Sequence, residues 1–464
     1  HRAMRRVFIW LACLVCVLAA AGIGFWFAYL HDIPEIEVQF QPLRIADAEQ
    51  QGEHDCFWMG PVSIETFNVA FPDSGALYWP TIFEASLGEG DYIELKGFYP
   101  RARYFSINTY TDGAVPYDNL TDQAILPDEN STNPFLTGRY RARQAYTIRL
   151  LPGAAQDTRP ENTLYFGPAE DVDDVPLIFR VYVPESADDP TGGAGLPTAT
   201  LVRANGERLV GESMCAAIGS AEVGTDARSV RLPVIAMPVY QAMFRYREVR
   251  EQLLESPSGT WNIFWDPRLA LMRTATPALA QLLTFAARIG LVAKTSGYYA
   301  NIDNDYVSTY INERFGEVVV LEGRLPRTPA RGVDAAFISE YDLRYWSLCT
   351  NEGLATTRYA DCVYDSQVTI DHERNYTIVV SKAASRPDNA TIECGVTWLD
   401  WGEHGDGAGH GELGILIIRN MLPSPDFTSA IQRVPRPGDE QSTMGPHLPE
   451  VQYASRADFE RRGC

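Results

Sequence analysis

Positively charged residues are scarce in this chain. Of its 464 residues, 39 are lysine or arginine and 60 are aspartate or glutamate, which gives a formal net charge of −21 at pH 7. A protein this acidic repels the phosphate backbone of nucleic acids. The composition therefore argues against a nucleic acid partner.

The short motifs that mark common catalytic and nucleotide-binding sites are also missing. The sequence contains no GxSxG elbow, no GxxxxGK phosphate loop, no HExxH zinc motif and no EF-hand spacing. Paired carboxylates for glycoside cleavage have no local signature, because the two groups can come from anywhere in the fold. The sequence thus favours a protein that is not an enzyme but leaves an anchored hydrolase open.

No CxxC pair occurs beyond residue 30, which argues against a zinc ribbon or a thioredoxin-type site. An even number of cysteines lies there, as is typical of disulfides in an exported domain: Cys56, Cys215, Cys349, Cys362, Cys394 and Cys464. We expect Cys349 to pair with Cys362, because they flank a turn between two predicted strands. Pairing of Cys349 with Cys394 is the main competitor, and Cys56 with Cys215 is expected as a second bridge.

The N-terminal segment contains an uncharged apolar run from Val7 to Leu30. A helix over this run spans roughly 36 Å, enough to cross a bilayer. Arginines precede it and acidic residues follow, so the positive-inside rule places the short N-terminus in the cytoplasm and the body in the periplasm or outside the cell. Gly22 and Gly24 give the helix a small-residue face, on which we expect it to pack against another membrane protein.

The alternative to a retained anchor is a cleaved signal peptide, for which Ala19, Ala20 and Ala21 would supply the cleavage site. The apolar run continues past these alanines through Phe25, Trp26 and Phe27. We therefore favour a single-pass membrane anchor.

Two long segments, Asp91–Glu185 and Glu317–Pro423, resemble each other in order and pattern. IELKG matches VVLEG, ARYFSINTY matches LRYWSLCTN, YTIRL matches YTIVV, and IFRVYVP matches LIIRNMLP. Short β-branched and alternating stretches of this kind predict strands. The fold class we expect is mainly β: two related antiparallel β-sandwich or jelly-roll-like modules with a helical insert.

The expected domain boundaries follow from this repeat. They are a transmembrane anchor over 1–33, a first β module with an N-terminal extension over 34–215, a helical connector over 216–297, a second β module over 298–430 and a tail over 431–464. Within the connector, apolar residues recur every three or four positions from 233 to 259. A second apolar stretch, 277–297, is short for a membrane span and is expected to form a buried helix.

The paired motif also resembles a known family. The pattern with Arg103-Tyr104-Phe105-Ser106, repeated as Arg344-Tyr345-Trp346-Ser347, and the strand ending Tyr182-Val183-Pro184 resemble tandem bacterial envelope domains of unknown function. The resemblance covers roughly 200 residues of the body. It implies an envelope β-sandwich protein and carries over no catalytic residue.

A glycine-rich stretch with histidines and acidic residues, Glu403–Glu412, raises the question of a metal site. It contains GHGELG, which nominally fits GxGxxG, but a strand follows where a dinucleotide site needs a helix. Its counterpart in the first repeat, Gly167–Pro176, is also acidic but lacks histidine. We therefore predict a mobile surface connection between two strands.

Metal ligands nevertheless remain candidates in several loops. His404, Asp406 and His410 suit a transition metal if they converge. Structural calcium is the other option, because acidic side chains offer hard oxygen ligands at Asp171, Asp173, Asp174, Asp303 and Asp305. No cofactor is certain from the sequence.

Three functions are compatible with these observations. The first is an accessory or structural subunit of a membrane or envelope complex, with other membrane subunits as partners. The second is an anchored envelope hydrolase with its site between the modules, which close carboxylates in a cleft would favour. The third is a lipid- or glycan-binding module.

Overall fold

The computed structural model describes residues 36–39, 56–63, 68–84, 87–111, 114–156, 158–167, 174–219, 229–232, 237–245, 247–255, 257, 259–263, 299–329 and 340–464. The expected anchor, with Gly22 and Gly24, lies outside these residues, as does the helix expected over 277–297. None of the helices in the described part is both long and apolar enough to span a membrane.

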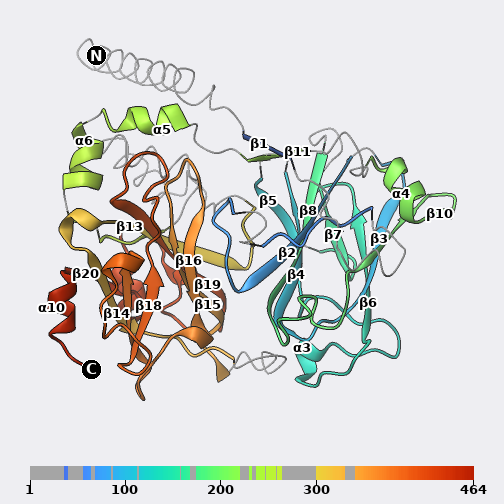
Figure 1. The fold of residues 1–464 in the computed structure, drawn as a ribbon. Helices are drawn as coiled ribbons and strands as arrows, with labels where there is room; N and C mark the ends of the chain where they lie inside the picture. Colours follow the sequence, from blue (N-terminus) through green and yellow to red (C-terminus); the bar gives the residue numbers. More distant parts are fainter. Residues whose placement is uncertain are drawn as a thin grey trace, which may run out of the picture.

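The first β-sandwich consists of two sheets with a core between them (Figure 1). One sheet has the order β2-β8-β4-β5, and its strands are Ala76–Glu84, Asp174–Pro184, Ala102–Tyr110 and Pro116–Thr121. The other has the order β10-β9-β3-β6-β7, and its strands are Arg208–Leu209, Thr198–Val202, Tyr92–Phe98, Ala145–Leu151 and Thr163–Tyr165. Two short helices, α3 (Pro134–Thr137) and α4 (Gly211–Ala217), lie at its ends.

The second β-sandwich is built in the same way. Its larger sheet has the order β12-β13-β19-β15-β16, with strands Asn262–Ile263, Asn304–Asn312, Leu413–Pro423, Leu343–Asn351 and Tyr359–Tyr364. Its smaller sheet has the order β18-β17-β14-β20, with strands Val396–Asp400, Asn375–Ser381, Val318–Arg324 and Glu450–Ala454. Helices α9 (Glu440–Met444) and α10 (Arg456–Glu460) follow near the C-terminus.

The two sandwiches share one strand order. The series β2-β8-β4-β5 corresponds to β13-β19-β15-β16, and β9-β3-β6-β7 corresponds to β20-β14-β17-β18. In each sandwich every pairing of the described strands is antiparallel except one, which joins β6 to β7 and β17 to β18. Four of the matching pairs, β3 with β14, β4 with β15, β6 with β17 and β8 with β19, are those that the sequence repeat aligned.

A glycine facing a tyrosine across two strands recurs in both sandwiches. Gly97 pairs with Tyr146, and Gly323 pairs with Tyr376. A Cβ atom on either glycine would lie 2.7 Å from the tyrosine hydroxyl. Each tyrosine ring therefore needs the space that its glycine leaves, and both rings are buried in the core.

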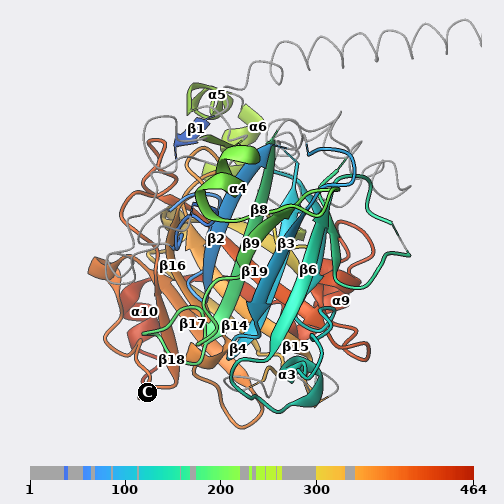
Figure 2. The same cartoon turned by 90° about the vertical axis from the view of Figure 1, so that its right-hand side faces the viewer.

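The two sandwiches form a stack of four sheets, with sheets β2-β8-β4-β5 and β12-β13-β19-β15-β16 in the middle (Figure 1). Seen from the side, the first sandwich lies in front of the second (Figure 2). All nine residues of β4 and all nine of β15 are buried, because one face of each strand covers its own core and the other faces the neighbouring sandwich. We call the contact between sheet β2-β8-β4-β5 and sheet β12-β13-β19-β15-β16 the junction.

The segment between the sandwiches is partly helical, as expected. Helices α5 (Met237–Met243) and α6 (Arg247–Arg250) and the π-helical turn Glu251–Glu255 pack on the second sandwich. The same segment also supplies strands: β12 joins the larger sheet, and β11 (Ser229–Leu232) pairs with β1 (Ile36–Gln39).

The expected C-terminal boundary of the second module is wrong. β20 lies in the stretch 431–464, which the sequence analysis treated as a tail, yet it pairs with β14 along five residues. A disulfide also joins Cys464 to Cys394. The second sandwich therefore extends to the end of the chain, and β20 was missed because it lies far in sequence from the strand it pairs with.

Candidate functional site

Two arginines cross the junction in opposite directions. Arg103 of β4 reaches the second sandwich, where its Nη1 lies 2.6 and 2.7 Å from the two carboxylate oxygens of Asp365. Arg344 of β15 reaches the first sandwich, where its Nη1 lies 2.9 Å from Oδ2 of Asp122. Arg103 and Arg344 occupy the same place in the repeat, and each aspartate directly follows the matching strand, β16 or β5. The pairs therefore obey an approximate twofold relation.

Both ion pairs are removed from water. The side chains of Arg103, Asp365, Arg344 and Asp122 are at most 1% exposed. Burial raises the pKa of Asp122 and of Asp365, and the facing guanidinium opposes that rise in each case. Since an unpaired charge is very costly in such surroundings, each partner makes the other tolerable.

Two tyrosines next to these arginines cross the junction in the same way. The hydroxyl of Tyr104 donates to Asp303, just before β13, at 2.5 Å. The hydroxyl of Tyr345 donates to Asp73, shortly before β2, at 2.6 Å. Burial, and then the facing aspartate, raise the pKa of both tyrosines well above its ordinary value. Both phenols therefore remain protonated hydrogen-bond donors.

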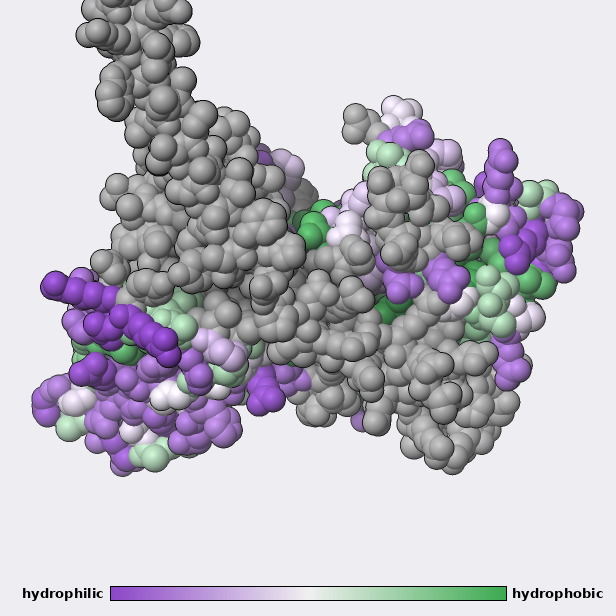
Figure 3. Space-filling model, turned by 90° about the horizontal axis from the view of Figure 1, so that it is seen from above, coloured by the Kyte–Doolittle hydropathy of each residue, from purple (hydrophilic) through white to green (hydrophobic). Residues whose placement is uncertain are grey.

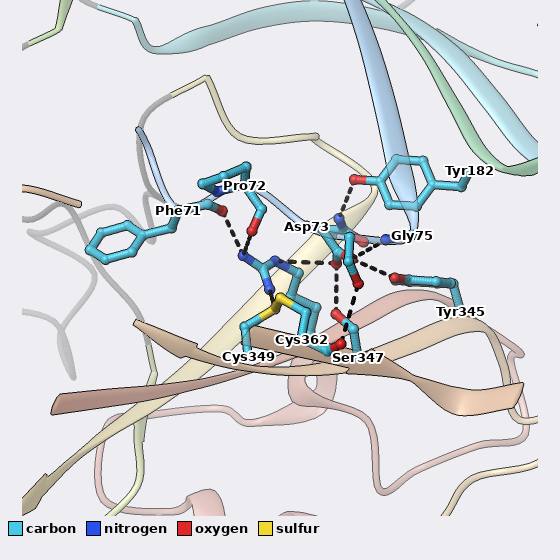
Figure 4. A network of polar contacts seen from close by, with 12 residues as sticks. Phe71, Pro72, Asp73, Gly75, Tyr182, Tyr345, Ser347, Cys349 and Cys362 are labelled. Carbon is cyan, nitrogen blue, oxygen red and sulfur yellow. Dashed lines mark hydrogen bonds and ion pairs between the residues drawn. A yellow bond between two sulfur atoms is a disulfide. The ribbon is translucent and has the colours of Figure 1, made fainter. Parts of the chain in front are cut away.

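Asp73 lies at the centre of a polar network at the junction (Figure 4). Its carboxylate also accepts hydrogen bonds from Ser347 Oγ at 2.7 Å and from the Gly75 amide at 2.9 Å. Arg419 of β19 lies beside it, with Nε 3.6 Å from Asp73 Oδ2. With its side chain 1% exposed, Asp73 is fully engaged and shielded from solvent.

The disulfide between Cys349 and Cys362 borders this network (Figure 4). With Asp73 it forms the single group of three or more His, Cys, Asp or Glu side chains, within the described residues, whose ligand atoms are close enough to hold a metal. The site does not fit a metal, because disulfide sulfurs are poor ligands and the Arg419 guanidinium lies 2.8 Å from Cys349 Sγ. In the first sandwich Asn108 stands in the place of Cys349, and Arg180 donates to it at 2.8 Å.

The cysteines form three disulfides in all. Two are the expected pairs, Cys349 with Cys362 and Cys56 with Cys215. The third joins Cys394 to Cys464, so the competing pairing of Cys349 with Cys394 does not occur. All six cysteines of the body are bonded, and no thiol remains among them for catalysis.

The acidic residues considered for calcium are not brought together. Asp303 is held by Tyr104 and by Asn119 Nδ2, which lies 3.2 Å from its Oδ1. Asp305 is the second residue of β13, and Asp174 begins β8 opposite Glu84. Asp171 and Asp173 lie outside the described residues. Among the described side chains, none of these acids belongs to a group with metal-ligand spacing.

The stretch Glu403–Glu412 joins β18 to β19, as expected, but it is not simply a solvated loop. Asp406 is 1% exposed, and its carboxylate accepts from the Ala408 and His410 amides at 2.8 and 3.0 Å. Its other oxygen lies 2.8 Å from His410 Nδ1, and the His410 ring stacks on Phe244. The sequence predicted a mobile stretch because its glycines have high conformational freedom. In the structure, the hydrogen bonds of Asp406 and the packing of α5 hold the stretch in one conformation.

The three residues proposed for a transition metal do not converge. Asp406 and His410 contact each other, whereas His404 is exposed and lines a separate small pocket. A hydrogen bond from His410 to Asp406 explains that pair without a metal. Asp73, Asp122 and Asp365 were not recognised as the partners of Tyr345 and the two arginines, since partners across a junction leave no local signal.

Comparisons with known proteins give matches of low similarity. No protein-family model and no curated protein matches the chain. A putative uncharacterized protein from Burkholderia cenocepacia aligns over 89% of this chain and 85% of its own, with a TM-score of 0.45 and 11% identity. A protein from Vibrio parahaemolyticus aligns over 88% of this chain and 94% of its own, with a TM-score of 0.38 and 10% identity. At these values neither supports an argument about activity.

Proposed function

We propose that the chain is a membrane-anchored, exported accessory subunit whose two sandwiches act as one rigid body in an envelope complex. The observation that carries this proposal is the pair of crossed ion pairs, Arg103 with Asp365 and Arg344 with Asp122. Because each buried charge needs its partner from the other sandwich, the ion pairs favour one arrangement of the two sandwiches. Such a body suits a scaffold that presents fixed surfaces to partners.

The three disulfides support the exported location. Disulfides persist in oxidising compartments such as the periplasm and are rare in the cytosol. The bonds Cys56–Cys215 and Cys394–Cys464 join residues 159 and 70 positions apart, one in each sandwich. They would stabilise a domain that functions outside the cytoplasm.

The surface is consistent with a body that works in water. The visible described part of the second sandwich is mostly hydrophilic, with small hydrophobic areas among the polar residues (Figure 3). We therefore expect the contacts with partners to come from the anchor and from limited areas of the body.

The alternative of a hydrolase with its site between the modules receives less support. Such an enzyme needs accessible carboxylates in a cleft. At the junction, the carboxylates of Asp73, Asp122 and Asp365 are buried and hydrogen-bonded. They serve as partners of arginine and tyrosine side chains.

A glycan-binding role is the second candidate, because a hollow of about 600 Å³, lined by both polar and apolar side chains, lies on the second sandwich. Its lining includes Glu322, Asp371, Asn375, Thr377 and Gln441. Carboxylates, amides and hydroxyls of this kind suit a sugar better than a lipid. Binding of soluble oligosaccharides that Gln441→Ala abolishes would support it, and equal binding by both proteins would contradict it.

The accessory role is tested by co-purification after gentle solubilisation. We expect wild-type chain to retain membrane-protein partners and Gly22→Leu/Gly24→Leu to lose them, because leucine blocks close approach of helices. The matched control is Leu18→Ile, in the same apolar run, which leaves the small-residue face intact. Equal recovery of partners by wild type and the double variant would contradict packing through this face.

A further inference from the structure

A small pocket of about 300 Å³ lies where the stretch Glu403–Glu412 passes the turn after β15. It is lined by Glu352, Arg358, His404, Gly407 and Gly409. Backbone hydrogen bonds fix both sides: the Glu352 amide donates to Arg358 O at 2.8 Å, and the Gly353 amide donates to Asp406 O at 2.9 Å. The pocket is therefore built by two segments that hold each other in place.

A buried carboxylate without a protein partner lies in this pocket. Glu352 is 7% exposed, and its Oε2 is buried without a hydrogen bond from any protein group. Asp73, Asp122, Asp365 and Asp406, the other buried carboxylates described above, each accept a hydrogen bond on at least one oxygen, although Asp122 Oδ1 also lacks a partner. Leaving a buried charged group unpaired destabilises a fold, and such costs are tolerated mainly at functional sites.

The chain leaves room for this carboxylate in a specific way. A Cβ atom on Gly407 would lie 2.4 Å from Glu352 Oε2, and Gly407 has a φ of +67°. A glycine is needed there both for the backbone conformation and for the carboxylate behind it. The glycines of this stretch thus shape a pocket as well as a turn.

Opposite charge is available at the pocket mouth. Arg358 and His404 are exposed, and both line the same pocket as Glu352. A ligand that enters would meet a guanidinium at the rim and a carboxylate below it. An ammonium group suits the carboxylate, and a carboxylate suits the guanidinium.

We propose that this pocket binds a small zwitterion of the amino-acid class, with its ammonium group at Glu352 and its carboxylate at Arg358. The binding site is separate from the junction and does not depend on the accessory role. The ligand would supply the partner that the protein does not give Glu352.

The test is calorimetric titration of the full chain in mild detergent with glycine, β-alanine and 4-aminobutyrate, which differ in the spacing of their charges. Butylamine and butyrate are the singly charged controls. We expect at least one zwitterion to bind better than about 10 mM, and about tenfold tighter than either control. Lack of binding by all three zwitterions, or equal binding by butylamine or butyrate, overturns the proposal.

Variants identify the site. Glu352→Gln keeps the shape, and we expect it to weaken binding by about tenfold or more, since it removes a charge-assisted hydrogen bond. Its melting temperature should be no lower than that of wild type, because a buried unpaired charge is removed. Arg358→Gln, at an exposed position, should weaken binding too, whereas Glu403→Gln in the same stretch should not. Wild-type affinity in both Glu352→Gln and Arg358→Gln would overturn the assignment.

Discussion

Arg103 and Asp365 form an ion pair that joins the two sandwiches, and both side chains are at most 1% exposed. The same contact is repeated in the opposite direction by Arg344 and Asp122, also fully buried. Charges in such surroundings are stable only together, so the junction depends on both members of each pair.

Removing one member should therefore be costly. We expect Asp365→Ala to lower the free energy of unfolding by about 3–5 kcal/mol, because Arg103 would keep a buried charge without a partner. Asp122→Ala should have a similar effect through Arg344. The measurement is urea denaturation of the full chain in detergent.

Two controls separate this effect from a general sensitivity to charge. Glu322→Gln breaks the exposed pair with Arg462, and it should change stability by less than about 1 kcal/mol. The double variant Arg103→Met/Asp365→Leu should recover most of the loss. A cost for Asp365→Ala as small as that for Glu322→Gln would show that the buried pair does not hold the junction.

Asp303 should make stability depend on pH. Burial raises its pKa from 3.8 to about 6 in the folded protein. A raised folded pKa means that the stabilising contribution of the protonated group is complete below about pH 4. It is lost as pH rises to about 6, since the folded protein must then carry a buried charge.

The variant Asp303→Asn should remove this dependence. Its free energy of unfolding should decrease less than that of wild type between pH 4 and 6, by up to about 3 kcal/mol. Glu403→Gln, at an exposed position, is the control. Parallel pH profiles for wild type and Asp303→Asn would contradict the assignment.

The Cys349–Cys362 bond closes a loop across β15 and β16. Its removal in Cys349→Ser/Cys362→Ser should lower stability by roughly 3 kcal/mol, as the chain-entropy account gives for a loop of this length. Mass mapping of non-reduced peptides checks the connectivity directly. A free thiol at Cys349 in the native protein would contradict it.

The stretch Glu403–Glu412 should contain no transition metal. We expect elemental analysis after chelator-free purification to find zinc and copper well below one equivalent, since Asp406 and His410 bond each other and His404 lies apart. His410→Ala should lower stability through lost packing on Phe244 without changing the metal content. Stoichiometric zinc that the variant loses would make this stretch a metal site.

Much of the strand framework could be predicted from the sequence. The segments aligned as IELKG with VVLEG and as ARYFSINTY with LRYWSLCTN are β3 with β14 and β4 with β15, which hold equivalent places in their sheets. Periodicity and β-branched residues are local signals, so they can be recognised in the sequence without knowledge of the fold. The pairing of strands that lie far apart in the sequence cannot be recognised in this way. For this reason the sequence analysis assigned β20 to a tail.

Fewer of the contacts at the junction could be predicted from the sequence, for the same reason. Arg103 and Arg344 were visible as part of a repeated motif, but their partners lie 262 and 222 positions away. Asp303 was considered for calcium because its carboxylate offers hard oxygen ligands, whereas it accepts a hydrogen bond from Tyr104 across the junction. A charge pattern alone does not show whether the acid faces water or another domain.

The most direct test of the accessory role is native electrophoresis of the full chain after gentle extraction from its own membranes. The account predicts that it comigrates with other membrane proteins in a complex that is larger than its mass of 51.7 kDa and its detergent require. Asp365→Ala should reduce the amount of this complex, because the two sandwiches no longer form one rigid body. Migration of wild-type chain as a monomer alone, under conditions that preserve known membrane complexes, would contradict the account.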